Sequence, residues 1–304
     1  RAALEPFLVR PTEPASIYNL LQPANPDGSG GRCTATAPGQ TVVNGYKTAR
    51  ITEPIRVWVK CTGNEDLDDI LLESALGYAR SFYPKMTATF GEPILDTTSV
   101  GLAGNLDTAI DIYIVPAGTA SLRSGQTQVG NGTTYGAGPS AGKTSSGYIL
   151  ISRARADSGG FKSTLAHEFF HVLQNAHNSQ FQFEGPAGAR SEYWWVEASA
   201  TWASTFYARS LAPVYDYPRF HGFQKSRQSL HKSFPSGTDD ALDMYTAFVW
   251  GFFQEQLHGG PAIIKSSWDA LRPVSSHREA TDALDGVFHF TETFHKFAVR
   301  NVNE

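Results

Sequence analysis

The strand-like and helix-like stretches of this 304-residue chain are separated along the sequence, and no other feature constrains its fold as strongly. Before residue 152, short segments carry alternating or unbroken apolar residues, as strands do. Beyond residue 160, apolar residues recur at helical spacing over most of the remaining chain. Because strands and helices are segregated in this way, we predict an α+β fold.

One early helix separates the predicted strands, and Pro84 is expected to follow its end. The stretch 117–146 is rich in Gly, Ser and Thr, which is typical of an irregular surface loop. The predicted strands are 55–60, 109–115 and 148–151, and the predicted helices are 66–83, 161–178, 191–210, 240–258, 261–271 and 277–300.

Three parts are expected along the chain. Residues 1–48 lack periodicity and are predicted as an extended N-terminal segment. Residues 49–180 form a β-rich lobe with a mixed sheet and the early helix, and residues 181–304 form a helical lobe packed on it. The helix at 161–178 closes the β-rich lobe and lies between the lobes, where a functional site is expected.

That helix contains the motif His167-Glu168-Phe169-Phe170-His171, an H-E-x-x-H pattern. Four residues advance a helix by about 400°, so both imidazoles extend from one face and can bind one metal ion. Glu168 lies beside them and can take a proton from water whose pKa zinc lowers from about 15.7 toward 7. The motif therefore predicts a metal site with its own general base.

Glu197 is the first candidate for the third protein ligand that a catalytic zinc requires. It is the lone anion of the otherwise apolar stretch 194–202 in a predicted helix, and a carboxylate in such a place needs a charged partner or a metal. The alternative is a surface ion pair with Arg190 or Arg209. Glu192 and Glu184 are further candidates.

His177 is the main competitor of Glu197, because its spacing matches the longer pattern H-E-x-x-H-x-x-G-x-x-H. The glycine of that pattern, which lets the chain turn away from the helix, is Gln174 here. Without that turn, His177 lies about 15 Å further along the helix than His167 and cannot reach the same ion. We therefore favour Glu197 as the third ligand.

The motifs at 167–174 and 195–200, followed by 245–253 and 257–260, resemble those of the gluzincin, or peptidase-MA-like, metallopeptidases. The resemblance extends over about residues 50–300. It implies a zincin architecture like that of thermolysin, in which the helix with the two histidines lies between the lobes.

The same resemblance implies roles for single residues. One catalytic zinc ion would be bound by His167, His171 and Glu197, with Glu168 as general base. Tyr245 would donate a hydrogen bond to the oxyanion, a role that a phenol hydroxyl suits on chemical grounds as well. His231 is the alternative donor. The competing interpretations are that Tyr245 is a core residue and that His231 is a surface or loop residue, neither with a catalytic role.

The overall charge excludes one class of partner. The chain has 25 Lys and Arg against 29 Asp and Glu, for a net charge of −4, and no strongly basic stretch. A protein of this kind does not bind nucleic acid by neutralising phosphates. No apolar run reaches the length of about 18 residues that a membrane-spanning helix needs.

Composition and cysteine content indicate an exported protein. The chain has 28 Gly, 12 Tyr and 6 Trp, and it begins at Arg1 rather than Met, as a processed product would. Cys33 and Cys61 can form a disulfide that closes a loop of about 29 residues. We expect a secreted protein that is a monomer.

The sequence therefore predicts a secreted zinc-dependent endopeptidase whose substrates are proteins or peptides, glycoproteins included. The alternative is a secreted module that binds glycan or protein and carries a structural or vestigial metal site. Structural zinc sites usually have four protein ligands, whereas catalytic sites leave one position open. The ligand count therefore distinguishes the two interpretations.

Overall fold

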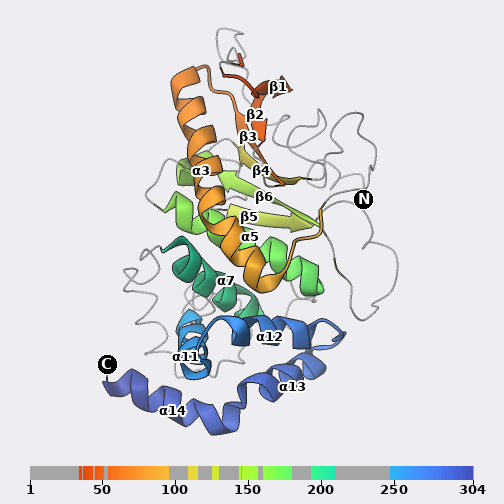
Figure 1. The fold of residues 1–304 in the computed structure, drawn as a ribbon, viewed down its shortest axis with the longest axis vertical. Helices are drawn as coiled ribbons and strands as arrows, with labels where there is room; N and C mark the ends of the chain where they lie inside the picture. The colour runs from red at the N-terminus through yellow and green to blue at the C-terminus, as the bar shows by residue number, and fades with distance from the viewer. Residues whose placement is uncertain are drawn as a thin grey trace, which may run out of the picture. The chain divides into compact units, whose positions relative to one another are not determined.

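The structure is a computed structural model that describes residues 34–35, 37–43, 45–50, 54–95, 109–115, 125–129, 144, 146–156, 160–179, 193–209 and 247–303. Within these residues the chain forms a β-sheet and a series of α-helices (Figure 1), which confirms the α+β class. The strands come first and helices dominate after residue 160, as the sequence pattern indicates.

Six strands form one sheet in the order β1-β2-β3-β4-β6-β5. β3 pairs in parallel with β4, and β4 with β6, whereas the other neighbouring strands are antiparallel, so the sheet is mixed as predicted. The strands are β1 (Thr41–Val43), β2 (Tyr46–Arg50), β3 (Ile55–Lys60), β4 (Ile110–Val115), β5 (Gly125–Val129) and β6 (Gly147–Ser152).

The central parallel strands are buried. Every residue of β4 and β6 is buried, which explains why each strand contains four consecutive apolar residues, 112–115 and 148–151, instead of an alternation with polar ones. Trp58 of β3 stacks on its register partner Tyr113 of β4, with ring centroids 5.8 Å apart. The indole N–H of Trp58 donates a hydrogen bond to Asp111, so the buried carboxylate has a partner.

Three strands differ from the expectations drawn from sequence. β1 and the first part of β2 lie within residues 1–48, where the sequence predicts an extended segment but no strand of the sheet. β5 lies within 117–146, where a loop is expected. β2 lacks an apolar pattern because it buries Lys47, whose ammonium group lies 2.8 Å from the Asp69 carboxylate. A buried cation with a partner is invisible to a hydrophobicity pattern.

Helix α3 spans Glu65–Phe90 and continues through Pro84, where the sequence predicts its end. Its first turn is capped by Asn64, whose side-chain oxygen accepts a hydrogen bond from the Leu67 N–H. A proline inside a helix costs about 3 kcal/mol or more. Met86 and Phe90, which follow the proline, are buried, and their burial offsets part of this cost.

The later helices follow the predicted segments with two exceptions, the first of which is the helix expected at 240–258, which begins at Phe248. The segment 277–300 is divided into two helices by His289, whose φ of 49° is left-handed and cannot continue a helix. The remaining helices are α4 (Arg153–Ala156), α5 (Phe161–Asn178), α7 (Tyr193–Ala208), α11 (Phe248–His258), α12 (Ala262–Leu271), α13 (His277–Phe288) and α14 (Phe290–Asn303).

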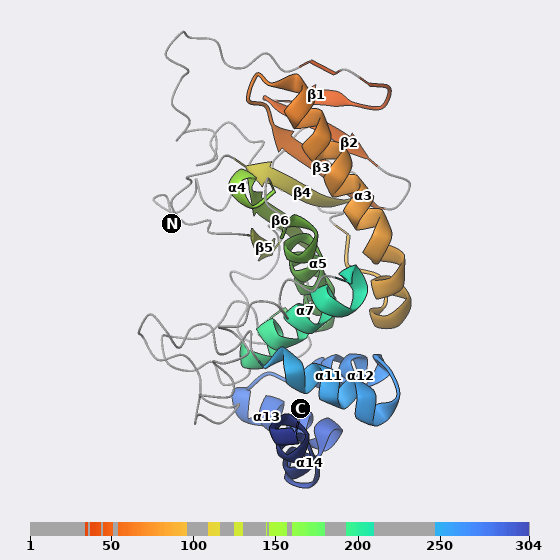
Figure 2. The ribbon, with the colours of Figure 1, turned by 90° about the vertical axis from the view of Figure 1, so that its left-hand side faces the viewer.

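The chain divides into two compact units. The first contains the sheet, α4, α3 up to Pro84 and α5 up to Val172, with the rings of Phe82 and Tyr83 packed on Phe169. The second contains the remaining parts of α3 and α5 with α7 and α11 to α14, where α11 packs on α7 and α12 (Figure 2). Helices α3 and α5 each contribute residues to both units, and the boundaries of the predicted lobes stay a prediction.

Candidate metal centre

Helix α5 carries both histidines of the motif and is one uninterrupted helix over the predicted residues. Its apolar side chains are buried, and the ring of Phe169 lies 5.5 Å from that of Phe82 in α3. The buried apolar residues that hold α5 in place are Phe161, Leu165, Ala166, Phe169, Phe170, Val172 and Leu173.

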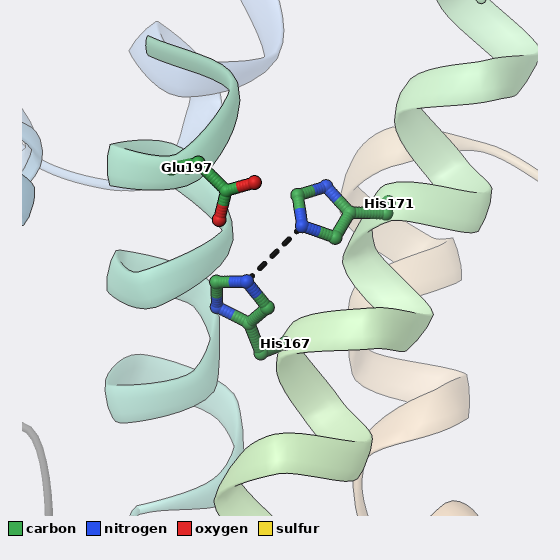
Figure 3. Close-up of side chains that lie close together, drawn as sticks. All are labelled: His167, His171 and Glu197. Atoms are coloured by element: carbon green, nitrogen blue, oxygen red, sulfur yellow. Dashed lines mark hydrogen bonds between the residues drawn. The ribbon is translucent and has the colours of Figure 1, made fainter. Parts of the chain in front are cut away.

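His167 and His171 lie one turn apart on α5 and bring their ring nitrogens together. The two Nε2 atoms are 3.1 Å apart, and the ring planes are nearly perpendicular at 84° (Figure 3). The four-residue spacing makes the two side chains neighbours on one face of the helix.

Glu197 extends from α7 toward the two imidazoles (Figure 3). One ligand atom from each of His167, His171 and Glu197 lies within 4.8 Å of the others, so this group could hold a metal ion. The Glu197 side chain is only 5% exposed, which contradicts the alternative of a surface ion pair with Arg190 or Arg209.

The donor set fits a divalent ion such as zinc. Two ligands on a tetrahedral zinc at about 2.0–2.1 Å lie about 3.3 Å apart, close to the observed 3.1 Å between the Nε2 atoms. Two imidazoles and a carboxylate form the protein ligand set of many catalytic zinc sites, which leave one position open. In the part of the chain that the structure describes, this group consists of three side chains, and all three are of types that bind zinc.

Burial of the group is uneven, and this bears on access. His171 and Glu197 are buried, whereas His167 is partly exposed. Glu168, the predicted general base, follows His167 on α5 and is also buried. Solvent therefore reaches the group at His167, and the role of Glu168 in proton transfer stays a prediction.

His177 is held elsewhere and does not join the metal group. Its Nε2 lies 3.1 Å from the Phe90 carbonyl oxygen, and its Nδ1 lies 3.2 Å from an Arg272 nitrogen and 3.3 Å from an Asp269 oxygen. Burial lowers the pKa of His177, so the ring is neutral, with Nε2–H donating to Phe90. α5 continues to Asn178, so Gln174 produces no turn, as the sequence predicts.

Other predicted site residues lie outside the described residues. Tyr245, His231, Glu184 and Glu192 belong to this group, and their roles stay predictions. Cys33 lies outside as well, so its disulfide with Cys61 also stays a prediction.

Sequence reasoning missed the contacts between α5 and α7 beside the metal group. In the sequence, Gln174 stands out only because it occupies the glycine position of the pattern H-E-x-x-H-x-x-G-x-x-H. In the structure its amide donates to the Val196 carbonyl and to the Ser199 hydroxyl, at 2.9 and 3.0 Å. The sequence shows only that the polar Gln174 follows the apolar run that ends at Leu173. The hydrogen-bond partners of Gln174, which is buried, depend on tertiary structure.

A scan against protein-family models and a search of curated proteins found no match to this chain. No helix in the described part of the chain is long and apolar enough to cross a membrane.

Proposed function

We propose that this protein is a secreted zinc-dependent endopeptidase of the gluzincin type. The observation that carries the proposal is the convergence of His167, His171 and Glu197, whose ligand atoms lie within 4.8 Å of one another. Two of these residues are local neighbours, whereas the third comes from a different helix, so chance alignment of an H-E-x-x-H pattern does not account for the group.

His167, His171 and Glu197 would hold the zinc ion. When bound, zinc polarises a carbonyl group and makes water acidic enough to lose a proton near neutral pH. The coarse arrangement of a mixed sheet followed by α5 and α7 supports a thermolysin-like zincin architecture as part of the proposal.

Glu168 performs the proton transfers of the proposed hydrolysis. Its carboxylate takes a proton from the attacking water as the new C–O bond forms at the scissile carbonyl carbon. It then gives that proton to the leaving nitrogen as the C–N bond breaks, so one carboxyl group serves both steps. The products are a carboxylic acid, which then loses its proton to solvent, and a free amine.

The carbonyl oxygen gains negative charge during this reaction and needs a hydrogen-bond donor. The phenol of Tyr245 is proposed for this role, and His231 is the alternative donor. Losing one such donor costs about 10²–10³-fold in kcat. Activity of Tyr245→Phe and His231→Ala on one peptide distinguishes them, because only the true donor's variant falls in kcat.

The change Glu168→Gln tests the proposed mechanism, because it preserves the size of the side chain and removes its basicity. We expect hydrolysis of a mixed peptide library to fall by about 10²–10⁴-fold while zinc stays bound. Zinc content and cleavage products are measured on the same preparation. Cleavage at the wild-type rate by the zinc-loaded variant would contradict the role of Glu168.

The same experiment distinguishes the proposed peptidase from the alternative, a secreted binding module. Such a module retains zinc and yields no cleavage products from the wild-type protein, with or without a chelator. Chelator-sensitive cleavage by the wild type supports the peptidase.

A further inference from the structure

A buried hydrogen-bond network joins α5, α7 and α12 next to the metal group. Gln174 of α5 donates from Nε2 to the Val196 carbonyl and to Ser199 Oγ, both in α7. Trp268 of α12 donates its indole N–H to the same Ser199 oxygen, at 3.2 Å. We call Gln174, Ser199 and Trp268 the amide clamp.

The hydrogen-bonding capacity of Ser199 is fully used in this network. Its hydroxyl donates to the Trp195 carbonyl at 2.6 Å and accepts from Gln174 and Trp268. A hydroxyl has one donor and two acceptor sites, so each is occupied. All the clamp side chains are buried, and a satisfied buried network fixes one arrangement of the elements that it joins.

A second contact fixes α7 on α12 in the opposite direction. Trp195 of α7 donates its indole N–H to Ser267 of α12 at 2.9 Å, while Trp268 of α12 donates to Ser199 of α7. Each of the two helices therefore donates one hydrogen bond from a tryptophan to a serine of the other helix. This reciprocity holds α7 in one axial position.

That axial position decides whether Glu197 can meet the histidines. Gln174 lies one turn after His171, and its acceptor Val196 O belongs to the peptide group that leads into Glu197. Ala198 and Ala200, which flank Ser199, are buried but have no polar side-chain atoms with which to make such contacts. If α7 were displaced along its axis by one turn, Thr201 would take the place of Glu197 beside the histidines, and Thr201 has no carboxylate.

We infer that the amide clamp positions Glu197 for metal binding, an inference that rests on the proposed zinc site. Gln174 and Ser199 are positioning residues, because they act through the backbone of α7. Outer contacts of this kind typically change metal affinity by about 10–100-fold.

The test compares Gln174→Met with Asn178→Ala. Methionine fills the volume of glutamine without its N–H donors. Asn178 is a matched control one turn further along α5, where its buried amide donates to Leu271 O and Val274 O, at 2.8 and 2.9 Å, and not to α7. Both variants are expected to lose stability in urea unfolding.

The readouts are the zinc dissociation constant, from competition with a chromophoric chelator, and the absorption spectrum of the Co²⁺ form. We expect Gln174→Met to weaken zinc binding by about tenfold or more and to alter the Co²⁺ spectrum, and Asn178→Ala to leave both unchanged. Ser199→Ala should weaken binding in the same direction.

Two results would overturn the inference, and they differ. Wild-type zinc affinity in a folded Gln174→Met variant would show that the clamp contributes only to stability, and the zinc site would stand. Failure of the wild-type protein itself to bind zinc would remove the proposed site, and the positioning role with it.

Discussion

Two buried histidines of α5 serve different purposes because their partners differ. His171 faces His167 and Glu197, whereas His177 lies between the Phe90 carbonyl and the side chains of Arg272 and Asp269. Burial keeps the pKa of His177 below its ordinary value, although the hydrogen bond with the Phe90 carbonyl opposes this shift. The nearby cation of Arg272 lowers the pKa further, and Asp269 opposes it by a smaller amount. The same residue type is therefore a candidate metal ligand in one turn and a neutral structural group in another.

The lowered pKa of His177 makes stability depend on pH. The unfolded chain binds a proton at this histidine near pH 6.5, and the folded chain does so only at lower pH. The stability that the neutral ring provides is therefore complete above about pH 6.5 and is lost as the pH falls toward the folded pKa.

We predict that His177→Gln shows a flatter decline of unfolding free energy between pH 7.5 and pH 5 than the wild type. Glutamine can still donate to the Phe90 carbonyl but does not titrate. Urea unfolding at several pH values, with a chelator present to exclude metal effects, measures this difference. Equal slopes for the two proteins would contradict the assignment of His177 as a buried neutral group.

The metal ligands illustrate what a sequence can reveal about single residues. The His167–His171 pair is predictable because one helical turn fixes its geometry, and the structure agrees. Glu197 can be proposed because a carboxylate in an apolar helix needs a partner. The partners of Gln174 are not predictable, since they come from the packing of α5 on α7.

Close packing of α7 against α11 depends on one glycine. A Cβ at Gly251 would lie 3.1 Å from Cβ and Cγ of Trp202, which is fully buried. The Trp202 ring is itself held by Phe90, Phe206 and Tyr207 around it. The neighbouring atoms therefore have little freedom to move.

We predict that Gly251→Ala destabilises the protein by about 1–2 kcal/mol. Overpacking costs about 1–3 kcal/mol, and the better helix propensity of alanine returns at most about 1 kcal/mol. Gly77→Ala in α3 is the matched control, because a Cβ there meets no atom within 4 Å. That control should gain up to about 1 kcal/mol in urea unfolding. A stabilised Gly251→Ala variant would show that α7 and α11 pack less tightly than described.

Whole elements were predictable where their patterns are strong and local. α5, α12 and β3 match the predicted segments closely, because apolar spacing specifies them. α3 passes through Pro84 because later residues are buried in tertiary contacts, which a local rule for proline cannot include. His289 divides α13 from α14 without a glycine or proline to mark the break.

For the molecule as a whole, the proposed metal would link two segments that are remote in sequence. His167 and His171 come from α5 and Glu197 from α7, so an ion bound by all three favours the folded chain over the unfolded one. Zinc at about 100 times its dissociation constant would add about 2.7 kcal/mol to the free energy of unfolding.

A zinc titration of the wild type and two single variants tests the central claim most directly. We predict that the wild type binds one zinc ion per chain, that Glu197→Ala loses this binding, and that His177→Ala retains it while folded. Zinc binding that survives loss of Glu197 and disappears with His177, or a wild type that binds no zinc, would contradict the account.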